Sequence, residues 1–125
     1  MRPASLARPL GLALALTLAL AAWSTSARHN RLTHSLPAAD TTLASPAEIR
    51  LSFSERPEPR LSAISLLASD SSRVALGPVR ATSDPLTISA AVPAPLAAGR
   101  YAVVWRTTST DGHAVRGRFV FTVRN

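Results

Sequence analysis

Beyond residue 27 the sequence consists of short stretches in which apolar and polar residues alternate, with prolines between the stretches. "EIRLSF" places Ile49, Leu51 and Phe53 on one face and polar residues on the other. A period of two residues is typical of a β-strand with one buried face. Prolines between such stretches interrupt no hydrogen bonds of the sheet. We expect strands at residues 31–36, 48–53, 61–68, 73–76, 86–92, 101–107 and 118–123.

These strands indicate the fold class. No stretch after residue 27 has a helical period over a dozen residues. Seven short strands in one small chain predict an all-β, two-sheet Greek-key sandwich of immunoglobulin-like type. "PLAAGRYAVVW" favours the same fold, because a leucine and a glycine ahead of Tyr101 resemble the tyrosine corner of such sandwiches.

Residues 1–27 have the pattern of a secretory signal peptide. Two arginines precede the uncharged run "LGLALALTLALAA", and small residues follow it. The run is shorter than the roughly 20 residues that a membrane-spanning helix needs. Thr25 and Ala27 fit the positions before a cleavage site, so we expect one mature domain, residues 28–125. It should be periplasmic or otherwise exported, soluble after cleavage, and without disulfides because the chain has no cysteine.

The charge of the chain is strongly positive, and all of its basic residues are arginines. A basic chain raises the possibility of nucleic-acid binding. These arginines are dispersed, aromatic residues are few, and an exported protein rarely meets nucleic acid. We therefore expect no nucleic-acid partner, and interpret the arginines as a solvated face.

"TSTDGHAVRG" (residues 108–117) contains the first candidate for chemistry, the pair Asp111 and His113 around Gly112. Residues two apart in an extended chain point the same way, with Cα atoms about 6–7 Å apart. Both side chains could then bind one metal ion. Asp-Gly is equally a common turn dipeptide, and a histidine beside a turn is often only solvated. The motif alone leaves both interpretations open.

Glu55 and His29 are the other candidates. Glu55 has the same parity as Phe53, so in a continued strand its carboxylate would face the core or its rim. A buried carboxylate needs a partner such as an arginine, backbone amides or a metal. If the strand ends at Ser54, Glu55 is exposed instead. His29 lies near the mature N-terminus and could reach the same end as Asp111, whereas we expect His34 on the surface.

Four stretches in this order and spacing resemble the CopC family of bacterial copper-resistance proteins, over essentially all of residues 28–125. They are "HNRLTHSLPAAD", "PAEIRLSFSE", "LAAGRYAVVWR" and "STDGHAVRGRFVFTV". The resemblance implies a Cu(II) site on a cupredoxin-like or immunoglobulin-like β-sandwich. Its ligands would be His29, Asp111, His113 and, as in some members, Glu55. Imidazole and carboxylate donors without a thiolate suit tetragonal Cu(II).

The resemblance also implies a function, which is extracytoplasmic Cu(II) sequestration, buffering or delivery by a monomer that is not an enzyme. The partners would be the copper ion and a membrane copper transporter. Catalysis by copper would need an open coordination position, and carboxylates would fill much of this site.

The sequence departs from the family pattern in two ways. Cleavage after Ala27 leaves Arg28 ahead of His29, so the terminal amine that usually helps to chelate copper would belong to Arg28. The only methionine is Met1, so we expect no thioether site for Cu(I). Because of Arg28, the alternative is a metal-free immunoglobulin-like interaction module with a degenerate copper site.

Overall fold

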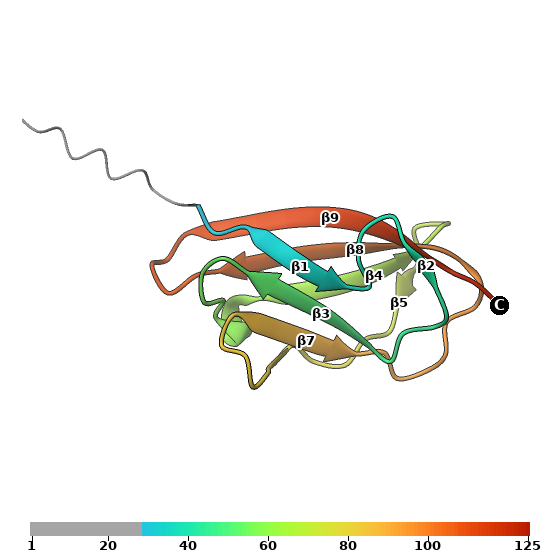
Figure 1. Ribbon diagram of the computed structural model, residues 1–125, viewed down its shortest axis with the longest axis horizontal. Coiled ribbons are helices and arrows are strands. Elements are labelled where there is room, and N and C mark those ends of the chain that lie inside the picture. Colours follow the sequence, from blue (N-terminus) through green and yellow to red (C-terminus); the bar gives the residue numbers. More distant parts are fainter. Residues whose placement is uncertain (1–28) are drawn as a thin grey trace, which may run out of the picture.

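Two β-sheets pack face to face in a computed structural model, which describes residues 29–125 (Figure 1). The expected signal peptide (1–27) and Arg28 lie outside the described residues. One sheet has the strand order β1-β3-β7-β6 and the other β2-β9-β8-β4-β5, which confirms the predicted all-β sandwich. The elements are β1 (Leu32–Leu36), β2 (Thr42–Leu43), β3 (Glu48–Phe53), the 3-10 helix η1 (Pro59–Leu61), β4 (Ala63–Ala68), β5 (Arg73–Val74), β6 (Arg80–Ala81), β7 (Thr87–Ala91), β8 (Gly99–Thr108) and β9 (Ala114–Val123).

All seven expected strands are present, and the structure adds β2 and β6. Each of these two has only two residues, which is too short for an alternating pattern. β2 pairs in parallel with the end of β9, through Thr42 and Thr122, and β6 pairs with β7 in antiparallel fashion. β8 and β9 have ten residues each and form a hairpin longer than the sequence pattern indicated.

The core lies between the sheets, where the alternate residues of β3, β8 and β9 meet. The ring of Phe53 contacts that of Trp105 edge-on, with centroids 5.2 Å apart, and joins the two sheets. Within one sheet, Tyr101 stacks on Phe121 at 5.7 Å. The buried cluster comprises Ile49, Leu51, Phe53, Leu66, Ile88, Tyr101, Val103, Trp105, Phe121 and Val123.

Tyr101 forms the expected corner at the start of β8. Its hydroxyl donates a hydrogen bond of 2.7 Å to the carbonyl oxygen of Ala97, four residues upstream, while its ring is buried. This contact fixes the chain as it enters β8. The tyrosine-corner prediction is therefore confirmed.

Gly117 on β9 makes room for the indole of Trp105, its direct partner on β8. A Cβ atom at residue 117 would lie 2.7 Å from Cε2 of that indole, which is closer than real Cβ contacts. The glycine of the "HAVRG" stretch is thus a packing requirement. It lets the largest aromatic side chain of the core lie flat against the neighbouring strand.

Candidate metal centre

Three segments meet at one end of the sandwich: the start of the described chain, the loop after β3, and the β8–β9 turn (Figure 1). Pro57 forms an isolated antiparallel bridge with Ser109, and the backbone N–H of Glu58 donates to the carbonyl of Thr108 at 3.0 Å. These contacts join the loop after β3 to the turn. The hydrogen bonds of Arg31 and Ser54, at 2.9 and 3.0 Å, join that loop to the start of the chain.

The β8–β9 turn brings Asp111 and His113 together. Nδ1 of His113 lies 3.2 Å from Oδ2 of Asp111, and the other carboxylate oxygen accepts hydrogen bonds from the His113 backbone N–H and the Ser109 hydroxyl. Gly112 has a φ of 86°, which favours glycine. The two side chains therefore meet across a tight turn between the strands, and not along extended backbone as the spacing argument assumed.

The carboxylate of Asp111 is held in its charged form. The Ser109 hydroxyl, the His113 N–H and the His113 side chain lower the pKa of Asp111 to about 2, with the Ser109 hydrogen bond as the largest cause. Half of the Asp111 side chain and 72% of the His113 side chain are exposed. An anionic oxygen thus lies beside an imidazole nitrogen, and a cation from solvent can reach both.

Glu55 lies just beyond β3, which ends at Phe53. The residue is partly buried, whereas the sequence suggested either a carboxylate that faces the core or a fully exposed one. Its backbone N–H donates to Oδ1 of Asn30 at 2.9 Å. Within residues 29–125 its carboxylate forms no salt bridge or hydrogen bond, so this carboxylate is available as a ligand.

Asn30 is a site residue that sequence reasoning missed. It is only 5% exposed, and besides the N–H of Glu55 its Oδ1 accepts a 3.3 Å hydrogen bond from the Ser54 hydroxyl. Its amide nitrogen is buried and, among the described residues, has no partner. The exposed His29 immediately precedes it, so Asn30 holds the backbone next to His29 against the Glu55 loop. A single asparagine within the "HNRLTHSLPAAD" stretch gives no sequence signal for this role.

The four expected ligands share one end of the molecule but form no common coordination sphere. No group of three or more histidine, aspartate or glutamate side chains in residues 29–125 is arranged to hold a metal ion. The structure brings Asp111 and His113 into contact, and it ties the chain beside His29 to the backbone of Glu55. His34 is exposed on β1, as expected.

Comparison with known proteins gives consistent matches. The model of the CopC domain family matches residues 32–124. Copper resistance protein C of Escherichia coli is 34% identical over 103 residues, which cover 77% of this chain and 82% of the relative.

Solved structures with the same fold include PcoC from Escherichia coli, described as a methionine-rich copper resistance protein. It is 36% identical, covers 77% of this chain and 99% of its own, and superposes with a TM-score of 0.71. The crystal structure of CopC from Methylosinus trichosporium OB3b is 37% identical, with a TM-score of 0.70 and coverage of 76% and 93%. This chain has no methionine after Met1, and so differs from the methionine-rich PcoC in that respect.

Proposed function

This chain belongs to the CopC family, and from that premise we propose that it is an extracytoplasmic Cu(II)-binding protein for copper sequestration, buffering or delivery. The observation that carries the proposal is the contact between Asp111 and His113 at the end of the sandwich where the chain next to His29 is also held. Matching relatives that are named copper resistance proteins support the choice of metal.

The proposed ligands are His29, Asp111, His113 and Glu55. They offer nitrogen and oxygen donors without sulfur, a set that suits Cu(II), the divalent ion with the highest affinity for such sites. His29 and His113 are exposed, so a metal ion from solvent can reach both imidazoles. The carboxylates would lower the net charge of the bound ion and fill its remaining positions.

The proposed role is binding and transfer, and not catalysis. Among the described residues no helix is both long and apolar enough to span a membrane. The proposed acceptor for delivery is a membrane copper transporter. A site at one end of a rigid sandwich, on exposed side chains, suits direct transfer to such an acceptor.

The decisive experiment is a Cu(II) titration of the exported protein by isothermal calorimetry, together with its intact mass. We expect one copper ion per chain, and a loss of affinity of about tenfold or more in His113→Ala. His34→Ala is the matched control, because His34 is exposed on β1 and lies outside the proposed ligand set. It should bind as the wild type does. The mass reports whether Arg28 or His29 is the first residue, and thus which residue carries the terminal amine.

The metal-free interaction module remains the alternative. It predicts no Cu(II) binding with a dissociation constant below about 1 μM, which corresponds to a binding free energy of roughly −8 kcal/mol. It also predicts equal titrations for His113→Ala and His34→Ala. Either result would contradict the proposed function.

A further inference from the structure

The outer face of the five-stranded sheet collects arginines that are scattered in the sequence. On β8 and β9 the residues that alternate with the core positions face outward. On β5 the outward residue is Arg73, because its partner on β4 is Leu67 and not the core residue Leu66. The strand pairing therefore places distant positions side by side. The exposed arginines on this face are Arg73, Arg100, Arg106, Arg116 and Arg118.

The arginines of this face have no ion-pair partner within the described chain. None of the five arginines forms a salt bridge with a residue of the 29–125 range. Arg106 and Arg116 are direct cross-strand partners, an arrangement in which like charges repel and weaken the sheet. Two carboxylates adjoin the face without pairing with these arginines: Asp70 accepts a hydrogen bond from the backbone N–H of Ser72, and Asp40 has its backbone N–H bonded to the carbonyl of Val120. The face therefore has unfavourable electrostatics that an anionic partner would relieve.

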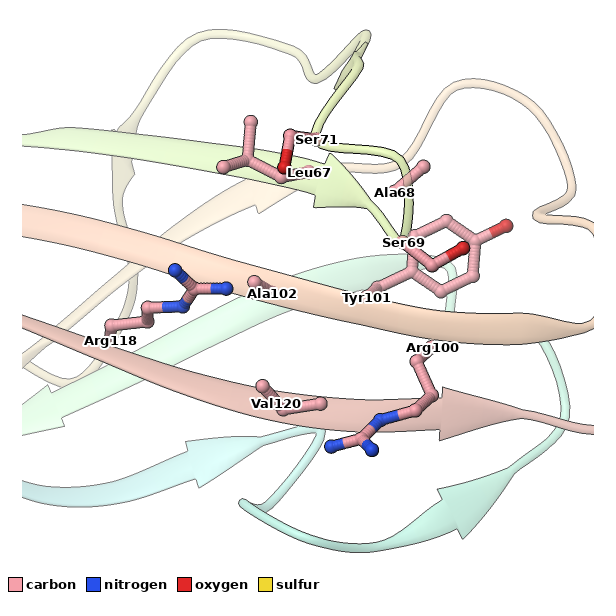
Figure 2. A pocket seen from close by; sticks show the side chains of 9 residues that line it. All are labelled: Leu67, Ala68, Ser69, Ser71, Arg100, Tyr101, Ala102, Arg118 and Val120. Atoms are coloured by element: carbon pink, nitrogen blue, oxygen red, sulfur yellow. The ribbon is translucent and has the colours of Figure 1, made fainter.

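A hollow of about 320 Å³ lies in this face. Figure 2 shows Arg100 and Arg118 on either side of the short side chains of Ala102 and Val120. Leu67 continues this apolar floor, and Ser69 and Ser71 line the rim beside β4. Two cationic groups thus flank a shallow apolar depression.

This arrangement has the composition of a protein-binding surface. Such interfaces combine an apolar centre with a polar rim, and arginine is enriched in them because its guanidinium binds carboxylates in a bidentate manner. Adsorption to a membrane would instead favour large apolar side chains that protrude into the lipid. In residues 29–125 the exposed large hydrophobic residues are Leu36, Leu61 and Leu86, and all three lie outside the strands of this sheet.

We propose that the outer face of the five-stranded sheet is a docking surface for an acidic, extended segment of a protein partner. Carboxylates of the segment bind Arg100 and Arg118, and an apolar side chain between them enters the hollow over Ala102 and Val120. The surface is built from the broad face of the sheet and does not use the proposed copper ligands. The inference therefore stands or falls separately from the copper proposal.

The test uses a short fluorescent peptide in which glutamate, valine and glutamate occupy every second position, with serines between them, and binding is followed by fluorescence anisotropy. Alternate side chains of an extended segment face the same side, so this pattern presents both carboxylates and the valine to the hollow. The wild type binds the peptide, and Arg100→Glu/Arg118→Glu weakens binding about tenfold or more. Arg60→Glu/Arg80→Glu is the matched control, since it changes the net charge equally at exposed positions outside this sheet. It retains most of the affinity. Added salt weakens binding to the wild type, because the contacts are between exposed charges.

Equal losses in the two double variants would overturn the proposal, since they would show an effect of net charge alone. No binding by the wild type would also overturn it. Vesicles of phosphatidylglycerol, with phosphatidylcholine as the reference, test a lipid surface in place of a protein. If the wild type binds these vesicles through Arg100 and Arg118 but does not bind the peptide, the protein-partner inference is wrong. Thermal unfolding of each variant shows whether a loss of binding comes from a folding defect. The neutral double variant Arg100→Gln/Arg118→Gln tests the same contacts without introducing negative charge.

Discussion

Oδ1 of Asn30 lies 2.9 Å from the backbone nitrogen of Glu55, and this hydrogen bond ties the start of the described chain to the loop after β3. Residues 29–31, the arm that precedes β1 and carries His29, are thus held at the same end of the sandwich as Glu55. Because Pro57 pairs with Ser109, the same loop also contacts the turn that carries Asp111 and His113. One buried asparagine therefore has a direct effect on where the proposed ligands lie.

Asn30→Ala should lower both stability and Cu(II) affinity. The substitution removes the acceptor of the partly buried Glu55 N–H, and a donor left without a partner costs up to about 1–3 kcal/mol. It also removes the buried Nδ2 atom that has no partner among the described residues, which offsets part of this cost. The arm would also lose a contact that positions His29. Chemical denaturation and a copper titration measure the two effects. Thr33→Ala is the control, because it removes an exposed hydrogen bond of β1, from Thr33 to the Ser52 carbonyl. If both variants match the wild type, Asn30 has no positioning role.

Asp111→Asn should weaken Cu(II) binding by roughly 10–100-fold, whether the carboxylate binds the metal or orients His113. The amide keeps the size of the side chain but removes the negative charge beside the imidazole. Electron paramagnetic resonance of the copper-loaded protein reports the change in the ligand set. Asp70→Asn provides the comparison, since Asp70 also accepts a hydrogen bond in a turn but lies outside the proposed site. An unchanged spectrum and affinity in Asp111→Asn would exclude Asp111 from the site.

Copper binding should weaken as the pH is lowered from about 8 to about 5. Cu(II) binds the neutral imidazole, so protons compete with the metal for any histidine ligand. Calorimetric titrations across this range measure the dependence, and His34→Ala should follow the same curve as the wild type. Constant affinity across the range would mean that histidine is not a ligand.

The predictable part of this molecule is the part set by local pattern. The alternation around Ile49, Leu51 and Phe53 identifies β3, because a strand with one buried face must repeat every two residues. The two-residue strands β2 and β6 have no such period, and their pairing depends on tertiary packing. The spacing of Asp111 and His113 suggested either a shared metal ion or an ordinary Asp-Gly turn, and the structure shows a turn that places the two side chains 3.2 Å apart.

The features that could not be predicted depend on register between distant strands. Arg106 and Arg116 become direct neighbours only through the pairing of β8 with β9, so the sequence shows them as dispersed. The anchoring by Asn30 likewise requires that the start of the chain lies beside the end of β3. Neither relation has a short-range signature.

Gly117→Ala should destabilise the fold by about 1–3 kcal/mol, because a methyl group at this position collides with the Trp105 indole. The indole would have to move, and its edge-on contact with Phe53 would be lost. Thermal or chemical denaturation measures the change, and near-ultraviolet circular dichroism reports the altered tryptophan environment. Gly77→Ala is the matched control, since its Cβ would make ordinary contacts with Ala91. Equal stability of the two variants would show that the close approach at Gly117 is unimportant.

In Asp84→Asn the free energy of unfolding should fall less steeply with decreasing acidic pH than it does in the wild type. The backbone N–H of Leu86 and then the hydroxyl of Thr87 donate to the Asp84 carboxylate, each at 2.9 Å, and they lower its pKa from the ordinary value of 3.8. The folded state therefore binds its proton at lower pH than the unfolded state does.

The stabilisation from this carboxylate is fully present above the unfolded-state pKa, and it is lost as the pH falls through the folded-state value. An asparagine cannot be protonated in this range, so the variant lacks this contribution to the pH dependence. Denaturation by urea at a series of acidic pH values measures both curves. The pKa values of Asp70 and Asp111 are lowered as well, so both proteins keep some acid sensitivity, and the difference between the curves isolates Asp84. If the free energies of unfolding of the two proteins fall in parallel at acidic pH, the hydrogen bonds of Asp84 do not favour its charged form in solution.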